Sequence, residues 1–265
     1  MKPKAVLASL AITLAGTSLG GVSMAGAEEL GGVVVGASAE PVVGAMVTLR
    51  RSGERSRGDL WETTVFTDDA GQFTFAGIPV RDRMELRVRR IGWQELVVED
   101  GWPGKQKLQL VVSRETNPEA VAQQLPADRW FALLYRKVSK PGLQENLARR
   151  CLYCHQQGSL RTRLPRDEAS WSAVLDRMAA FGAALEPELR EQLPGLLVSA
   201  YDPRTAVPAL TADMMSSDFA PPVPPEVRRA VIDEWELGGR ESMQHDIVVH
   251  PDGRVYSVDL QQDML

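Results

Sequence analysis

The spacing of apolar residues changes near Ser113, and this change divides the chain into two kinds of structure. In residues 30–112, short β-branched runs alternate with turn residues, which is typical of an antiparallel all-β domain. Beyond Ser113 the apolar period becomes about three and a half residues, which indicates helices. The first region should form six or seven strands, at residues 32–36, 45–50, 61–67, 72–76, 85–90, 94–98 and 107–112.

Three segments of the β region carry a family pattern: residues 40–47 (EPVVGAMV), residues 67–75 (TDDAGQFTF) and Gly77-Ile78-Pro79. They resemble the carboxypeptidase regulatory-like family, and the resemblance covers about residues 30–98. The family implies a small Greek-key sandwich with a non-catalytic accessory or adhesion role. We therefore expect residues 28–112 to form such a domain.

Residues 113–142 are predicted to form a helical linker after the β domain. Trp130, Leu133, Leu134 and Val138 share one face of this helical region, and we expect that face to pack on the next domain. Pro141-Gly142 should break the helix before the next domain begins.

The segment Cys151-Leu152-Tyr153-Cys154-His155 is a C-x-x-C-H motif, the attachment pattern of c-type haem. Residues three apart share one face of a helix, so both sulfurs would reach the haem vinyl carbons while His155 binds iron. A zinc site would need two further ligands, and the next histidines, His245 and His250, lie about ninety residues away. A redox-active thiol pair is the other alternative, but no thioredoxin-like alternation of strands and helices surrounds the cysteines.

The second iron ligand is predicted on a helix in which Trp171, Val174, Leu175 and Met178 fall on one stripe. Residues 151–201 also resemble small c-type cytochrome domains, in which Trp-x-x-x-hydrophobic-x-Arg-Met precedes a closing helix that ends in Tyr, and we place this haem domain at residues 143–202. In that family the methionine is the distal ligand, and the resemblance carries this role to Met178.

Other groups compete with Met178 or accompany it. Met214, Met215, a histidine near the C-terminus or an open iron position are the alternatives for the sixth ligand. Arg161 and Arg163 are candidate partners of the haem propionates, and a solvated surface is the alternative for both.

The N-terminal segment has the order of a secretory signal peptide, which we place at residues 1–27. Lys2 and Lys4 precede an apolar run at residues 5–19, and small residues end at Ala27. The run is shorter than the roughly 20 residues that a spanning helix needs, so we expect a periplasmic or otherwise secreted protein without stable membrane insertion. A net charge of -5 argues against nucleic-acid partners.

Residues 203–243 are predicted to be a proline-rich linker with a short helix at 224–237. Residues 244–265 contain two alternating runs around a Pro-Asp-Gly turn, which predicts a β-hairpin. This hairpin resembles the opening strands of virginiamycin B lyase-like β-propellers. Because a propeller needs four or more blades, we expect either a longer protein or pairing with a partner. His245 and His250 are interpreted as surface or strand residues.

Together these features predict a multidomain protein: an all-β Greek-key sandwich, a small all-α cytochrome c domain with one covalent haem c, and a short C-terminal β-hairpin. The expected activity is electron transfer with redox partner proteins, and no catalytic arrangement of side chains indicates autonomous catalysis. Two alternatives remain. One is the electron-accepting front part of a β-propeller dehydrogenase or lyase, and the other is a haem-based sensor.

Overall fold

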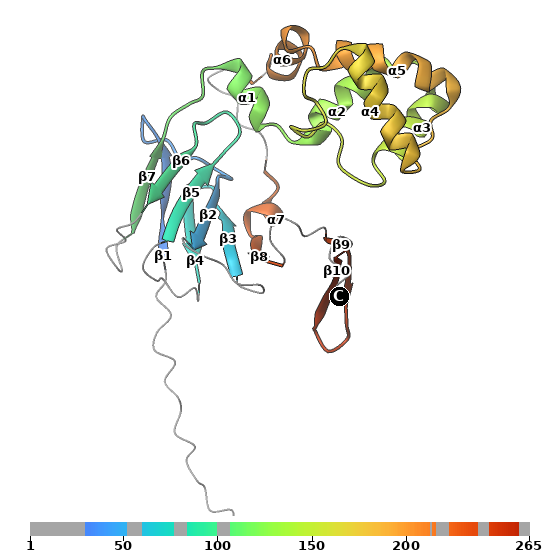
Figure 1. Ribbon diagram of the computed structural model, residues 1–265. Helices are drawn as coiled ribbons and strands as arrows, with labels where there is room; N and C mark the ends of the chain where they lie inside the picture. The colour runs from blue at the N-terminus through green and yellow to red at the C-terminus, as the bar shows by residue number, and fades with distance from the viewer. Residues whose placement is uncertain are drawn as a thin grey trace, which may run out of the picture.

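The structure is a computed structural model that describes residues 30–51, 60–76, 84–99, 107–212, 214–215, 223–237 and 244–259 (Figure 1). The expected signal peptide at residues 1–27 lies outside the described residues. The Gly77-Ile78-Pro79 segment of the family pattern also lies outside them.

Two β-sheets form the N-terminal region (Figure 1). The smaller sheet has the order β4-β1-β7, in which β1 is antiparallel to β4 and parallel to β7. The larger sheet has the order β6-β5-β2-β3-β8, and all its neighbours are antiparallel. The strands are β1 Leu30–Gly36, β2 Met46–Arg51, β3 Leu60–Phe66, β4 Gln72–Phe75, β5 Met84–Arg89, β6 Leu96–Glu99, β7 Leu108–Val112 and β8 Val231–Trp235.

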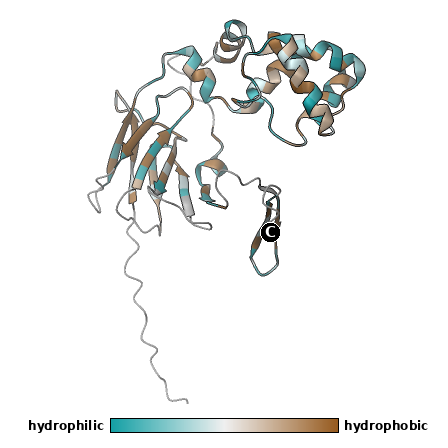
Figure 2. Cartoon of the chain, viewed as in Figure 1, coloured by the Kyte–Doolittle hydropathy of each residue, from teal (hydrophilic) through white to brown (hydrophobic). Residues whose placement is uncertain are grey.

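One hydrophobic core joins the two sheets, and Figure 2 shows apolar residues along their strands. Val34 and Phe75 from the smaller sheet, with Val47, Leu49 and Leu86 from the larger, are at most 2% exposed. The alternation of buried and half-buried residues in β5 is the period of two that the sequence displays. Strands lie at all seven expected places, and the region is β-sandwich-like.

The fifth strand of the larger sheet comes from far along the chain. β8 pairs with β3, and the Thr63 hydroxyl donates a hydrogen bond to the Asp233 carboxylate at 2.6 Å. The helix expected at 224–237 is therefore wrong beyond its first turn, because helix α7 covers only Pro225–Arg228. Residues 231–235 are rich in strand-forming types, and the open edge of β3 supplies backbone hydrogen bonds for them.

Six helices between β7 and β8 share a second hydrophobic core. Trp130, Leu134, Leu147, Leu189 and Leu193 in this core are at most 3% exposed. The helices are α1 Pro118–Gln124, α2 Ala127–Lys137, α3 Pro141–Cys151, α4 Glu168–Ala180, α5 Pro187–Ala200 and α6 Pro203–Thr211.

The expected fold class is wrong in its second part. The chain after β7 is not a small all-α cytochrome domain at residues 143–202; it is a mixed region in which α1–α7 are followed or accompanied by β8, β9 and β10. Helices α1, α2 and α6 lie outside the expected limits, yet they contribute residues to the same core as α3, α4 and α5. The apolar period marks helices but does not show which of them pack together, so the sequence pattern could not set these limits.

The sandwich and the helices are joined by a side chain of α1. The Gln124 amide donates to the Trp93 carbonyl at 2.8 Å and accepts from the Gly92 backbone N–H at 2.8 Å. The Arg114 guanidinium lies 4.1 Å from the centre of the Trp93 ring. These contacts fix the place at which the helical region leaves the β region.

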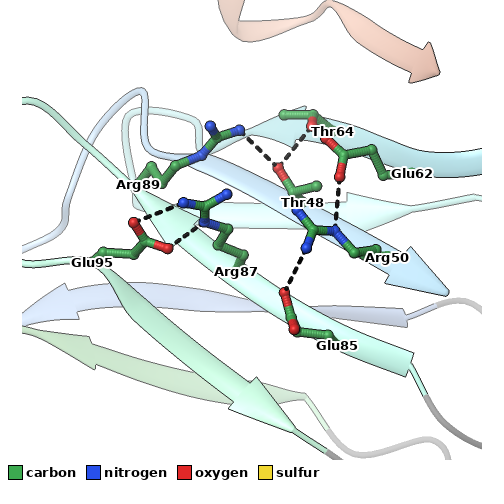
Figure 3. Close-up of polar contacts among 8 residues, drawn as sticks. All are labelled: Thr48, Arg50, Glu62, Thr64, Glu85, Arg87, Arg89 and Glu95. Atoms are coloured by element: carbon green, nitrogen blue, oxygen red, sulfur yellow. Dashed lines mark hydrogen bonds and ion pairs between the residues drawn. The ribbon is translucent and has the colours of Figure 1, made fainter. Parts of the chain in front are cut away.

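The outer face of the larger sheet is polar, as Figure 3 shows. The buried Thr48 and Thr64 hydroxyls share a hydrogen bond across β2 and β3 at 2.7 Å. Arg50 bridges Glu62 at 3.0 Å and Glu85 at 3.6 Å, which ties three strands together. These cross-strand pairs hold the sheet on the side that faces away from the core.

The last two described strands, β9 Gln244–Val249 and β10 Val255–Asp259, form a two-stranded sheet separate from the sandwich (Figure 1). Gly253 at its turn has a φ of 87°, a conformation that favours glycine. Ile247, Val248, Val249 and Val255 are all at least 58% exposed. Among the described residues, no helix has the length and apolar character needed to cross a membrane.

Candidate functional site

The C-x-x-C-H motif begins on the last residue of α3. Cys151 is half-buried against the helical core, whereas Cys154 and His155 lie exposed in the bends that follow. The sequence interpretation placed the cysteines on one helical face, but only Cys151 belongs to the helix. The Gln157 amide donates to the Cys151 carbonyl at 2.9 Å, which satisfies a backbone acceptor at the helix end.

His155 presents its ring to the solvent beside two neighbouring groups. Its Nδ1 lies 3.4 Å from the Gln156 carbonyl and 3.3 Å from the Gln157 amide nitrogen. The first contact needs a proton on Nδ1, whereas the second needs Nδ1 without a proton because an amide nitrogen only donates, so the two contacts belong to different tautomers of the ring. Only the tautomer with its proton on Nδ1 leaves Nε2 free for a metal, and the role of His155 as an iron ligand stays a prediction.

The loop that follows the motif is anchored to α2 by a close backbone approach. Gly158 is buried and has a φ of 79°. A Cβ atom at this position would meet the Ala127 carbonyl and lie 2.7 Å from the Phe131 nitrogen. Only glycine combines this conformation with this proximity, so Gly158 fixes the path of the motif loop against the start of α2.

Arg163 provides the second anchor of the same loop. Its guanidinium donates to the Gly158 carbonyl at 3.1 Å and to the Gln123 amide oxygen at 2.5 Å, and lies 4.0 Å from the Trp130 ring centre. Burial lowers the pKa of Arg163. Arg163 is therefore a buried structural group with two of its donors engaged inside the protein, whereas Arg161 is exposed. A propionate contact for either arginine stays a prediction.

Met178 lies half-buried on α4, on the helix whose Trp171 and Leu175 enter the core. Among the alternatives, Met214 packs partly buried against the helical core and Met215 is exposed. The sixth-ligand assignment of Met178 also stays a prediction.

The two C-terminal histidines belong to the hairpin. His250 lies beside Asp252, with its Nδ1 2.8 Å from a carboxylate oxygen. The side chain of His245 lies outside the described part of the chain. Across the described ranges, no group of three or more His, Cys, Asp or Glu side chains is arranged to hold a metal ion.

Burial changes the chemistry of Cys151 and of its neighbour Tyr201. Burial raises the pKa of the Cys151 thiol to about 11. It also raises the pKa of Tyr201, and the nearby Cys151 acts in the same direction. The Tyr201 hydroxyl is buried and makes no hydrogen bond to any described residue. A buried donor without a partner costs about 1–3 kcal/mol, which makes Tyr201 the least satisfied group near the motif.

The β-sandwich-like region can be assigned from comparison with known families. Residues 29–116 match the carboxypeptidase regulatory-like domain. This segment is a carboxypeptidase regulatory-like domain. The carboxypeptidase regulatory-like domain contains β1–β7, and β8 is added to its larger sheet from outside the matched residues.

Solved structures show only distant likeness to the chain. The dioxygenase domain of a dioxygenase carbohydrate-binding protein fusion from Streptomyces sp. SirexAA-E is 15% identical, with 36% of this chain and 84% of that chain covered and a TM-score of 0.26. Chlorocatechol 1,2-dioxygenase from Pseudomonas putida is 15% identical, with 33% and 60% covered and a TM-score of 0.23. These low scores support no conclusion about fold or chemistry. None of the curated proteins matches the chain.

Sequence reasoning identified the motif but missed the groups that surround it. Gly158 and Tyr201 carry no motif, and their importance depends on atoms brought close by folding. Arg163 was identified for its charge, whereas its buried position on Trp130 follows from the packing of α2. The one available signal for Tyr201 was its place at the end of the predicted closing helix.

Proposed function

We propose that this protein binds one haem c covalently through Cys151 and Cys154, with His155 as an iron ligand, and transfers single electrons outside the cytoplasm. The observation that carries the proposal is the C-x-x-C-H motif in a chain with only two cysteines. When bound, haem supplies an iron that alternates between two oxidation states. The protein supplies the attachment sites, the iron ligands and an apolar environment.

The side chains around the motif fit this group. Leu152, Tyr153, Leu160 and Leu164, in the motif and the loop that follows it, have side chains between 43% and 87% exposed. A haem attached beside the motif would cover these exposed side chains, and the burial of apolar surface is favourable. In the tautomer of His155 that donates from Nδ1 to the Gln156 carbonyl, Nε2 is free to bind iron, as covalent haem attachment requires.

The state of Cys151 argues against the redox-active thiol pair. A reactive C-x-x-C pair depends on a cysteine whose pKa lies below the usual value, because the thiolate is the nucleophile. Burial raises the pKa of Cys151 to about 11, which disfavours a thiolate. A neutral thioether suits this half-buried place better than a thiolate does.

The proposal is tested by producing the full chain in a bacterial periplasm together with a haem-attachment system. We expect haem to stay with the polypeptide on a denaturing gel and to give the pyridine haemochrome spectrum of c-type haem. The variants C151S and C154S should weaken or abolish the covalent attachment. His155→Ala should alter the iron spectrum, whereas His250→Ala, which changes another exposed histidine, should not. Full-length protein without a c-type spectrum would refute the proposal.

The exposed hairpin favours a second element of the proposal, namely that β9 and β10 begin a β-propeller with which the haem exchanges electrons. Its apolar residues, including Ile247 and Val249, are exposed, and a neighbouring sheet would bury them. Reading the coding region beyond Leu265 tests this element. Repeats of about forty residues are expected there or in an adjacent gene, since that is the length of one blade. Their absence from both places would contradict it.

Export is part of the same proposal, because the sequence that carries the C-x-x-C-H motif begins with a segment that has the pattern of a signal peptide. Cell fractionation should find the protein in the periplasm or the medium, with an N-terminus beginning after Ala27. A cytoplasmic protein that retains residues 1–27 would refute this part.

A further inference from the structure

Strand β8 forms one edge of the larger sheet and is covered on neither face. Its one described neighbour is β3, so the other side of its backbone is open. Val231 and Trp235, on the face that continues the core side of the sheet, are 62% and 52% exposed, and Ile232 on the outer face is 45% exposed. An open edge with apolar side chains on both faces is a place where another chain can add a strand.

A row of charged side chains crosses the outer face of the larger sheet and ends at this edge. Glu85, Arg50, Glu62 and Glu234 lie opposite one another in turn on β5, β2, β3 and β8. Arg50 bridges Glu85 and Glu62, as Figure 3 shows. Glu62 and Glu234 are like charges in directly opposite positions, which is unfavourable in a sheet, and hydrogen bonding to Glu62 raises the pKa of Glu234. The alternation of sign therefore breaks at Glu234, and a positive charge in the next position across the sheet would restore it.

The described strands of this chain do not supply that charge. β9 and β10 contain no lysine or arginine. β8 of a second copy, paired about a two-fold axis at its centre, would place two Asp233 carboxylates opposite each other. At the other edge of the sheet, Glu99 of β6 also lies opposite Glu85, but Leu96 and Val98 of that strand are already packed against the core. The occupant that fits β8 is therefore a strand from another protein.

We propose that β8 binds an extended segment of a partner protein, which adds a strand to the larger sheet and places a lysine or arginine opposite Glu234, with apolar residues beside those of β8. Main-chain hydrogen bonds to the open edge supply the affinity, and side chains at alternate positions determine which segment binds. The net charge of -5 favours the approach of a basic partner. The site lies on the sandwich, so the proposal does not depend on haem.

The test uses the full chain and two short labelled peptides in which valine and threonine alternate around one central charged residue, lysine in the first and glutamate in the second. Fluorescence anisotropy measures both dissociation constants. The lysine peptide should bind roughly three- to tenfold more tightly, since an opposite-charge pair replaces a like-charge pair at the edge. Glu234→Lys should reverse this preference, because it reverses the charge at the edge while it gives Glu62 an opposite charge across the strands.

The matched control is Glu191→Lys, which makes the same change in net charge at an exposed position of α5. It should keep the preference of the wild type. A preference that Glu234→Lys leaves unchanged, or that Glu191→Lys also reverses, would overturn the proposal. Failure of both peptides to bind would overturn it as well, and would mean that the charges of β8 protect the edge from pairing. A wild-type dimer that Ile232→Lys converts to monomer in analytical ultracentrifugation would place a second copy at this edge and would also overturn it.

Discussion

Gly158→Ala is expected to destabilise the protein strongly, because Gly158 is constrained in two ways. Its φ of 79° costs any other residue about 1–2 kcal/mol. The added methyl would also meet the backbone at Ala127 and Phe131, and relieving such overpacking costs about 1–3 kcal/mol more. The free energy of unfolding should therefore fall by about 2–5 kcal/mol in total.

Two other glycines separate these contributions. Gly182 has a φ of 98° but nothing within 4 Å of the added Cβ, so Gly182→Ala reports the conformational cost alone. Gly142 is the second residue of α3 and has nothing within 4 Å, so Gly142→Ala should leave the stability unchanged or raise it by at most about 1 kcal/mol. Urea unfolding followed by far-UV circular dichroism measures all three. If Gly158→Ala were no worse than Gly182→Ala, the close approach of the motif loop to α2 would be refuted.

Three further substitutions test contacts described above. Arg163→Gln should cost about 2–3 kcal/mol in urea unfolding, since two hydrogen bonds and a stacked ring are lost; the exposed Arg161→Gln is the control, and equal effects would contradict the anchor. Hydrogen bonding to Glu62 raises the pKa of Glu234 above 4.5, so the folded state binds this proton more tightly and stability is lost as pH rises from about 4.5 through the folded-state pKa. The thermal midpoint of Glu234→Gln minus that of the wild type should therefore increase as the pH rises from about 4 to 7. A difference that stays constant over this range would refute the proton-dependent hydrogen bond between Glu234 and Glu62. Thr63→Val should cost about 1 kcal/mol and increase hydrogen exchange in β8, and unchanged exchange would count against its pairing with β3.

The seven strands of the carboxypeptidase regulatory-like domain could be predicted because their signal is local. Alternation of apolar residues, as in residues 84–89, specifies both a strand and its buried face. β8 could not be predicted in the same way, because its residues are exposed and their strand conformation depends on the distant edge of β3. The limits of the helical region were missed for a related reason: helix α6 joins the core only through tertiary contacts.

The haem-attachment motif is also a local sequence signal, whereas the contacts that hold the motif in place depend on the folded chain. The prediction of haem attachment through Cys151, Cys154 and His155 depends on five consecutive residues alone. The Gln157 amide donates a hydrogen bond to the Cys151 carbonyl at the end of α3, and Gly158 lies against the backbone of α2. Such constraints arise from the folded chain and leave no periodic trace in the sequence.

The helical region is an insertion in the sandwich. The chain leaves the sandwich after β7 of the smaller sheet and returns to it at β8 of the larger sheet. An insertion held at both ends explores less space than one on a single tether, so the haem proposed for this region would stay within a limited distance of the sandwich. The same arrangement makes the matched residues 29–116 an incomplete unit. A fragment cut at those limits would expose the backbone of β3, and such open edges recruit strands from other molecules.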